Sequence, residues 1–451
     1  MFSKILIANR GEIAVRIIRA CKEMGISTVG VFSEADRESL HVSLADESYC
    51  IGGARSADSY LRQEAVLSAA LASGAEAIHP GYGFLSENES FARLCTQHGV
   101  VFIGPDADTI AKMGDKEQAK RTMREAGVPV IPGCDLVTDV AQAQDEATRI
   151  GFPLLIKARA GGGGRGIRRV DSLDDVVAQF AAAEAEAEAC FGDGAVYMER
   201  LLAPVKHVEM QILADTQGHV VCLGERDCSL QRKNQKLLEE SPAVRLPDAV
   251  RCAMQAASVA AGQAAKYHGA GTIEYLYDPA CEQFYFMEMN TRLQVEHPVT
   301  EMSTGIDLVK WQIRIAAGLP LDFAQEDILC SGHTIECRIN AENPYQNFRP
   351  SAGRVDLLHI PGGPCVRFDT AIYQGYAIPP FYDSMIGKLI VHAKTRDEAI
   401  RKMKAALCEL IVEGVETTAA YQEELLSGER FVEGSYCVGD GIAIQKRRAA
   451  V

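Results

Sequence analysis

A glycine run directly after an apolar stretch is the first feature with a readable chemistry. Phe152–Ile156 has the pattern of a strand, Lys157 follows it, and glycines occupy positions 161–164. Backbone N–H groups of such a loop can surround a polyphosphate, and the lysine supplies a point charge. It is not a Walker A loop, because no Gly-Lys-Ser/Thr follows at the required spacing. The run predicts either a phosphate-binding loop or a flexible hairpin tip.

Two carboxylates and an amide form a second constellation. Gly271–Tyr275 and Phe284–Asn290 are patterned as strands with a turn between them, so we expect a hairpin with Glu274 and Glu288 near one end. Carboxylate oxygens and the Asn290 amide oxygen suit a hard cation such as Mg²⁺ that also binds phosphate. The alternative is that one glutamate simply faces solvent.

A third constellation consists of a cation, an amide and a carboxylate at alternate positions, Arg292, Gln294 and Glu296. In an extended segment these side chains share one face, where they could hold a small oxyanion and move a proton. A surface ion pair is the alternative. Arg338 lies inside the apolar stretch Ile335–Ile339, where a charge needs a partner or a ligand.

The elements that must position these residues begin with alternating strands and helices. A helix is predicted at Gly11–Met24, and this alternation indicates a parallel sheet covered on both faces. Only Gly11 occupies the first strand-to-helix turn, so the three-glycine fingerprint of a dinucleotide fold is absent. The strands are predicted at Lys4–Ala8, Ser27–Phe32, Ala75–His79 and Val100–Ile103.

Further along, the sequence predicts an α/β region followed by an α+β region. Lys116–Ala126 is patterned as a helix, Val176–Ala189 as an exposed helix, and the polar run 224–236 as a solvated loop. From about residue 331 the chain is rich in strands, and a helix is expected near its end. The segments are Thr334–Ile339, Gly353–Ile360, Cys365–Phe368, Lys388–His392 and the helix Arg396–Glu409.

Composition excludes several classes of function. The 451 residues carry a net charge of −15 without a basic stripe, which argues against nucleic acid and anionic membranes as partners. No apolar run approaches the ~20 residues that span a bilayer. The 14 cysteines form no Cys-x-x-Cys pair, so we interpret them as buried, reduced thiols of a cytoplasmic protein.

Taken together, these motifs resemble the biotin carboxylase family of ATP-grasp enzymes over nearly the whole chain. The segments that carry the resemblance are 7–13, 79–88, the glycine loop 161–166, 287–301, 336–342 and 380–388. The resemblance implies an ATP-grasp fold with three domains: an N-terminal Rossmann-like parallel α/β domain at 1–114, an ATP-grasp domain at 115–330 and a strand-rich C-terminal domain at 331–446. A glycine-rich lid subdomain is expected at about 131–203.

The resemblance also implies a role for each site residue. Glu296 would be the base, assisted by Lys236 and Arg292, and Arg338 would face the ureido oxygen of biotin. Asn234 stands where many members of the family carry histidine, so altered nucleotide affinity is expected. The implied nucleotide contacts are Lys116, Lys157, Gly163, Gly164, Glu199, Leu202, His207, Gln231, Asn234, Glu274 and Glu288. The implied metal ligands are Glu274, Glu288 and Asn290, and the bicarbonate and biotin pocket is Lys236, Arg292, Gln294, Val295, Glu296 and Arg338.

The reaction implied by the resemblance is ATP-dependent carboxylation of carrier-bound biotin by bicarbonate through carboxyphosphate, with two Mg²⁺ or Mn²⁺ ions. No Met-Lys-Met biotinylation sequence is present, so a separate biotin carboxyl carrier protein and separate carboxyltransferase subunits are expected, together with a homodimer. Acetyl-CoA carboxylase, in fatty acid synthesis, is the default context; another acyl-CoA, pyruvate or urea carboxylase remains open. Two rival readings are another ATP-grasp ligase that joins a carboxylate to an amine and a nucleotide-sensing subunit without catalysis.

Overall fold

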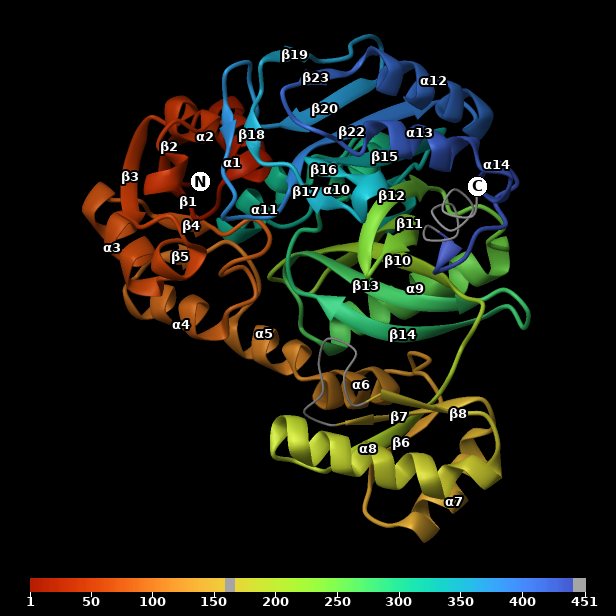
Figure 1. Ribbon diagram of the computed structural model, residues 1–451. Helices are drawn as coiled ribbons and strands as arrows, with labels where there is room; N and C mark the ends of the chain where they lie inside the picture. Colours follow the sequence, from red (N-terminus) through yellow and green to blue (C-terminus); the bar gives the residue numbers. More distant parts are fainter. Residues whose placement is uncertain (159–166, 441–451) are drawn as a thin grey trace. The chain divides into compact units, whose positions relative to one another are not determined.

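The computed structural model describes residues 1–158 and 167–440. Gly163 and Gly164, and the lid loop expected at 161–166, lie outside the described residues. The chain forms two compact units (Figure 1). The first consists of Met1–Val128, Lys206–Tyr275 and Glu288–Val451, and the second of Pro129–Val205 with Leu276–Met287. Each unit is described by itself below.

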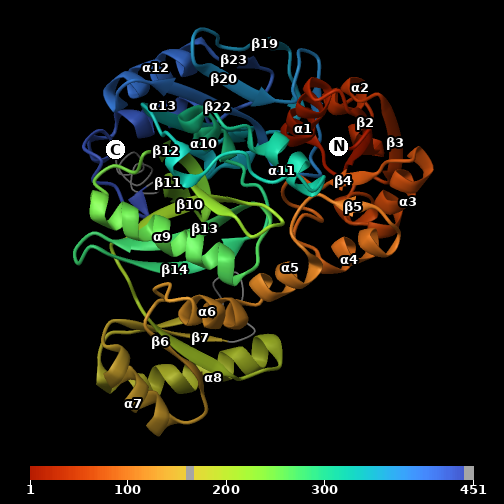
Figure 2. The same cartoon turned by 180° about the vertical axis from the view of Figure 1, so that it is seen from behind.

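A five-stranded sheet opens the first unit, in the order β3-β2-β1-β4-β5, and every pairing in it is parallel. Ile5 and Ile7 pack with α1 (Gly11–Glu23) and α11 (Leu308–Ala316), whereas Leu6 packs with α3 (Gln63–Ser73) and α4 (Glu89–Gln97). Figure 2 labels these helices around the sheet. Both faces are therefore covered, as predicted. The strands are β1 (Lys4–Ile7), β2 (Ser27–Ser33), β3 (Glu47–Gly52), β4 (Ala77–His79) and β5 (Val101–Phe102).

An eight-stranded sheet fills the rest of this unit, in the order β14-β13-β10-β11-β12-β15-β22-β20. The pairings from β10 to β20 are antiparallel. The end of the β13–β14 hairpin, residues 276–287, groups with the second unit. The strands are β10 (Lys206–Ala214), β11 (Val220–Arg232), β12 (Gln235–Ser241), β13 (Gly269–Asp278), β14 (Gln283–Asn290), β15 (His333–Asn340), β20 (Val366–Thr370) and β22 (Met385–Ala393).

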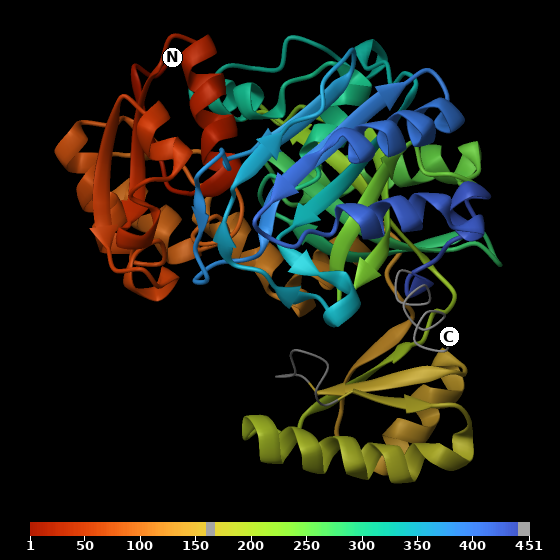
Figure 3. The ribbon, with the colours of Figure 1, turned by 45° about the horizontal axis from the view of Figure 1, so that its top comes forward.

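The two faces of this large sheet differ in character. One face carries an apolar core formed by residues such as Leu238, Cys337 and Leu389, against which α12 (Arg396–Glu409) packs; Figure 3 shows this helix in blue over the strands. The other face carries charged side chains beneath α10 (His297–Thr304). Charges buried on a sheet face need partners, and those partners form the site described below.

The remaining elements of the first unit connect or cover these sheets. None of the described helices has the length and apolar character needed to cross a membrane. The helices are α2 (Leu40–Leu44), α5 (Ala107–Gly114), α6 (Lys116–Glu125), α9 (Asp248–Ala264), α13 (Ala419–Ser427) and α14 (Glu429–Val432). The short strands are β16 (Glu342–Asn343), β17 (Arg349–Pro350), β18 (Gly353–Arg354), β19 (Leu357–His359), β21 (Ala377–Ile378) and β23 (Ile411–Glu413).

The second unit is a four-stranded antiparallel sheet with two helices. Its order is β6 (Gly133–Val137), β9 (Val196–Arg200), β7 (Leu154–Ala158) and β8 (Ile167–Val170). The helices α7 (Val140–Ile150) and α8 (Val176–Phe191) pack on it through the unit's own apolar core. The prediction that α8 is an exposed helix is wrong for one face, because Val176, Phe180, Ala183 and Ala187 are buried.

Three further predictions need correction. The run 224–236 is not a solvated loop, because most of it belongs to β11 and β12. Arg226 and Asp227 are buried and pair with Glu209 and Lys206 on the neighbouring strand β10, whereas Lys233 in the turn is exposed. Residues 353–360 form two short strands instead of one. All 14 cysteines are free, as expected, but seven are exposed: Cys50, Cys190, Cys252, Cys281, Cys330, Cys365 and Cys408.

Candidate active site

Glu296 lies at the centre of a buried cluster of charges. Its side chain is fully buried at the start of α10 and accepts hydrogen bonds from Lys236 Nζ at 2.5 Å and Arg338 Nη2 at 2.8 Å. Burial alone would raise the pKa of this carboxyl, but Lys236, Arg338 and Arg226 lower it well below its usual range. Glu296 is therefore an ionised carboxylate held between two cations from β12 and β15.

Lys236 connects Glu296 to two further carboxylates. Its Nζ lies 2.5 Å from Glu209 Oε2 and 3.0 Å from Glu274 Oε1. Burial would lower the pKa of Lys236, but the carboxylates of Glu209, Glu274 and Glu296 raise it well above its ordinary value. The ammonium group is thus a fixed positive charge, suited to hold a small anion.

Glu274 and Glu288 lie on the predicted hairpin. Glu274 Oε1 accepts hydrogen bonds from Asn290 Nδ2 at 3.0 Å and Gln294 Nε2 at 3.2 Å, and Glu274 Oε2 lies 3.1 Å from His207 Nε2. Burial and the charge of Glu274 raise the pKa of Glu288. A divalent cation fits this donor set, because it would relieve the repulsion between two carboxyls and is bound by oxygen ligands.

Arg292 spans the mouth of the cluster. Its Nε donates to Glu87 Oε2 at 2.8 Å, Nη1 to Gln294 Oε1 at 3.0 Å, and Nη2 to Asn290 Oδ1 at 3.0 Å. The predicted extended segment at 292–296 is wrong, since the chain turns here and enters α10 at Glu296 (φ −81°, ψ 14°). The turn still gathers these side chains, because each is bonded to a member of the same cluster.

Arg338 has the carboxylate partners that its position in a strand requires. Nε donates to Glu239 Oε1 at 2.7 Å, and Nη2 to Glu296 Oε2 at 2.8 Å. Nearby, Lys388 Nζ donates to the carbonyl of Val295 at 2.8 Å. This bond fixes the backbone directly before Glu296.

The nucleotide contacts implied by the sequence fall in both units. In the first, Gln231 Nε2 lies 2.8 Å from His207 Nδ1, and Lys116 is the exposed first residue of α6. Asn234 is exposed in the two-residue β11–β12 turn, at φ +64° after Lys233 at φ +49°. Asparagine adopts this left-handed conformation more readily than most residues, which gives it a local reason to stand there.

In the second unit, Lys157 Nζ lies 2.5 Å from Glu199 Oε2, and Leu202 is half-buried. Lys157 lies near the end of β7, and Glu199 lies on the adjacent β9. Glu199 pairs with Leu155 and Lys157 with Tyr197, so Lys157 and Glu199 are diagonal neighbours on one face of the sheet. This lysine and glutamate are therefore a pre-formed polar pair at the strand that precedes the glycine run.

Several residues of the cluster were not found from the sequence. Arg226 is fully buried and donates to Glu209 at 2.6 Å, Gln211 at 2.8 Å and Thr300 at 2.7 Å. Glu239 and Glu87 hold two of the proposed site arginines. The available signal was polar residues at every second position of an otherwise apolar strand, as in His207-Val-Glu209-Met-Gln211.

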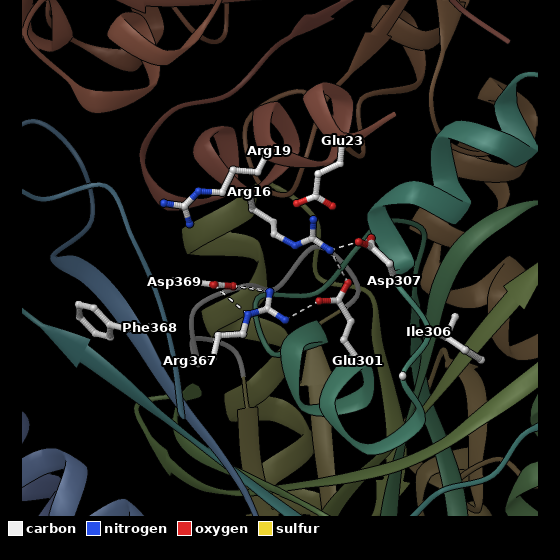
Figure 4. A pocket seen from close by; sticks show the side chains of 10 residues that line it. Arg16, Arg19, Glu23, Glu301, Ile306, Asp307, Arg367, Phe368 and Asp369 are labelled. Atoms are coloured by element: carbon white, nitrogen blue, oxygen red, sulfur yellow. Dashed lines mark hydrogen bonds and ion pairs between the residues drawn. The ribbon is translucent and has the colours of Figure 1, made fainter. Parts of the chain in front are cut away.

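A separate charged pocket lies elsewhere in the first unit (Figure 4). Arg16 pairs with Glu301 at 2.8 Å and Asp307 at 2.7 Å, and Arg367 pairs with Glu301 at 2.7 Å. These pairs tie α1 to α10 and β20. None of the predicted site residues lines this pocket.

The fold and the buried cluster define an ATP-grasp ligase. Residues 115–324 match the family described as carbamoyl-phosphate synthase L chain, ATP binding domain. Residues 1–110 match the biotin carboxylase N-terminal domain, and residues 336–439 match the biotin carboxylase C-terminal domain. The chain belongs to the biotin carboxylase family, and it is an enzyme.

Individual relatives agree with this assignment. Biotin carboxylase 1 of Bacillus subtilis is 53% identical over 437 residues, covering 97% of each chain. A crystal structure of the complex of Campylobacter jejuni biotin carboxylase with beta-gamma-ATP superposes with a TM-score of 0.90 at 47% identity, covering 97% of this chain and 98% of that one. The biotin carboxylase domain dimer of Hydrogenobacter thermophilus 2-oxoglutarate carboxylase, complexed with MgADP, ADP and bicarbonate, also gives 0.90 at 47%, covering 99% and 98%.

Proposed function

We propose that this chain carboxylates biotin on a carrier protein, using ATP and bicarbonate, and that the residues of the buried cluster carry out the reaction. The observation that carries the proposal is the ionised Glu296, held between Lys236 and Arg338 in a cluster that also contains Glu274. One buried cluster then offers a base, two cations for anions and a carboxylate for a metal ion.

Bicarbonate would bind to Lys236, Arg292, Gln294 and the backbone at Val295. As the anion recruits Lys236, this cation binds Glu296 less tightly, so the base becomes more basic when its substrate arrives. Glu296 would take the proton from bicarbonate, whose oxygen then attacks the γ-phosphorus of ATP and releases ADP. The product, carboxyphosphate, would break down in place to CO₂ and phosphate.

The second step would carboxylate biotin. The released phosphate would take the proton from biotin N1′, and N1′ would then form its bond to the carbon of CO₂. Arg338 would stabilise the negative charge that develops on the ureido oxygen. Its guanidinium is suited to this role, because in the structure it already donates to an anionic oxygen, Oε2 of Glu296.

Glu274, Glu288 and Asn290 would hold Mg²⁺ or Mn²⁺, two ions in all, which neutralise charge on the phosphate oxygens. The residues that would bind ATP are Lys116, Lys157, Gly163, Gly164, Glu199, Leu202, His207, Gln231 and Asn234. We propose domain boundaries at 114 and 330; the family matches 1–110, 115–324 and 336–439 lie close to them. The compact unit formed by Pro129–Val205 and Leu276–Met287 supports a separate lid subdomain at about 131–203.

We place the chain in the cytoplasm as a homodimer, acting with a separate carrier protein and separate carboxyltransferase subunits. The dimeric Hydrogenobacter domain supports the homodimer. Acetyl-CoA is the proposed final acceptor. The 2-oxoglutarate carboxylase relative shows that the same kind of domain serves another acceptor, so copurification with a carboxyltransferase is the test of this point.

The test of the activity itself is ATP hydrolysis by the purified chain with Mg²⁺. We expect hydrolysis that requires bicarbonate and rises when free biotin is added, with carboxybiotin as the product. Hydrolysis that depends on an amine would instead identify a ligase joining a carboxylate to that amine. ATP binding without hydrolysis under any of these conditions would identify a nucleotide-sensing subunit.

A further inference from the structure

A second row of charges lies beside the site, on the same face of the large sheet. Glu239 on β12 is the direct cross-strand partner of Glu336 on β15, and Arg338 on β15 is the partner of Lys388 on β22. Glu239, Glu336 and Lys388 are fully buried, and the Arg338 side chain is 15% exposed. Two glutamates therefore stand opposite each other inside the protein.

The hydrogen bonds of this row are incomplete. Within residues 1–158 and 167–440, neither side-chain oxygen of Glu336 has a hydrogen-bond partner, and Glu239 Oε2 has none. Glu239 Oε1 accepts from Arg338. Opposed side chains in an antiparallel pair have Cβ atoms about 4.5–5.5 Å apart, so their carboxyl groups can meet. Two ionised carboxylates would repel, whereas a proton between them satisfies both.

The nearby cations are already committed to other groups. Lys388 Nζ lies 3.0 Å from Glu12 Oε1 and donates to the Val295 carbonyl. Arg338 serves Glu239 and Glu296. Three carboxyls, those of Glu239, Glu296 and Glu336, thus surround one guanidinium, and one of the three has no counter-charge.

We propose that Glu336 is a neutral carboxylic acid that donates its proton to Glu239 Oε2 and thereby fixes the Glu239 carboxylate against Arg338. Glu336 is a positioning residue: it acts on Arg338 through Glu239. The consequence for biotin rests on the function proposed above, in which Arg338 faces the ureido oxygen. The protonation state of Glu336 does not rest on it.

The electrostatic surroundings agree with this assignment. Burial, and then the charge of Glu239, oppose ionisation of Glu336, and its pKa lies well above the ordinary value despite Lys388. Burial also raises the pKa of Glu239, to about 7, although Arg338 opposes this. The remaining charged groups that act on the pair are Glu296, which lies directly before α10 and opposes ionisation of both carboxyls, and Lys236 on β12, which favours ionisation of Glu239.

The protonation state of Glu336 determines how strongly the surrounding carboxylates attract the guanidinium of Arg338. With Glu336 protonated, Glu239 and Glu296 each carry one negative charge beside the guanidinium. Loss of the proton at alkaline pH adds a third negative charge and draws Arg338 away from a ligand. The KM for biotin should therefore rise on the alkaline side more steeply than the KM for ATP.

Infrared spectroscopy and kinetics test the two parts separately. Burial also raises the pKa of Glu239 and Glu288, so the band of Glu336 has to be identified by difference. The wild-type spectrum minus the Glu336→Gln spectrum at neutral pH should show the C=O stretching band of one buried, protonated carboxylic acid. Glu240→Gln is the matched control, because Glu240 is the next residue on β12 but is ionised on the opposite face by His333 and Arg396. This variant should keep the band.

In kinetics, Glu336→Gln should lose the alkaline rise in the KM for biotin, since an amide cannot ionise. Glu239→Gln should raise that KM by about tenfold, the scale of one charge-assisted hydrogen bond, with the KM for ATP within about twofold. A wild-type protein without the acid band, or a Glu336→Gln variant that keeps both the band and the alkaline rise, overturns the proposal. If Glu336→Gln fails to fold, Glu336→Asp takes its place: the shorter acid should shift the band from its wild-type position at neutral pH, and an unshifted band overturns the proposal.

Discussion

Replacing Glu296 with glutamine is the most direct test of the proposed base. The amide has nearly the same shape, but it carries no charge and cannot take a proton from bicarbonate. Loss of a general base typically costs 10²–10⁴ in rate. At about 1.4 kcal/mol for each factor of ten, the barrier should rise by roughly 3–5 kcal/mol.

The same change should affect stability much less than activity. Lys236 keeps Glu209 and Glu274 as partners, and Arg338 keeps Glu239, so neither cation loses all its carboxylates. Two charge-assisted hydrogen bonds are weakened without leaving an isolated charge, and we expect a loss of about 1–3 kcal/mol in the free energy of unfolding.

The assay is the kcat of bicarbonate-dependent ATP cleavage with biotin, alongside calorimetric titration of ATP, whose affinity should change by less than about threefold, a difference of under 1 kcal/mol. Glu301→Gln is the matched control, because Glu301 also lies on α10 and holds two arginines, Arg16 and Arg367, outside the cluster. It should lose similar stability but keep kcat within about threefold. A Glu296→Gln enzyme within about tenfold of the wild-type kcat would refute the role of Glu296 as the base.

Two further predictions concern stability. Arg226→Met should lower the free energy of unfolding, measured in urea, by about 3–5 kcal/mol, because it removes the fully buried partner of Glu209. The control is Arg169→Met, which breaks an exposed pair with Asp171 and should cost about 0–1 kcal/mol. Equal losses in the two variants would contradict this argument. Burial would raise the pKa of Glu240, but hydrogen bonds from His333 and Arg396 lower it from 4.5 to about 2. Glu240 therefore contributes about 3 kcal/mol above pH 4.5, and this contribution is lost as the pH falls towards 2. Glu240→Gln should be less stable at neutral pH and should flatten this part of the acid titration; an unchanged acid slope would be evidence against the assignment.

Local patterns in the sequence sufficed for the elements, but not for the pairing of charges. Alternation of strands and helices predicted the parallel sheet around β1, and turn residues predicted the β13–β14 hairpin, because both depend on neighbouring residues. The run 224–236 was read as a solvated loop, since nothing in its own sequence reveals that Arg226 meets Glu209 on another strand. Such partners are distant along the chain, and only the register of the sheet brings them together.

The pairing of β11 with β12 around Leu237 and Leu238 determines which side chains reach the site. Lys236 and Glu239 both face the charged cluster, although three positions separate them and a regular strand would send them to opposite faces. The pairing of β11 with β12 is irregular here: Leu230 faces Leu238, but Gln231 faces Lys236, so Leu237 is an extra residue. Because of this bulge, Leu237 and Leu238 both reach apolar clusters, and the charges on either side of them return to one face. Glu296, held by Lys236, and Arg338, held by Glu239, meet in one cluster only because β12 departs from regular alternation at Leu237.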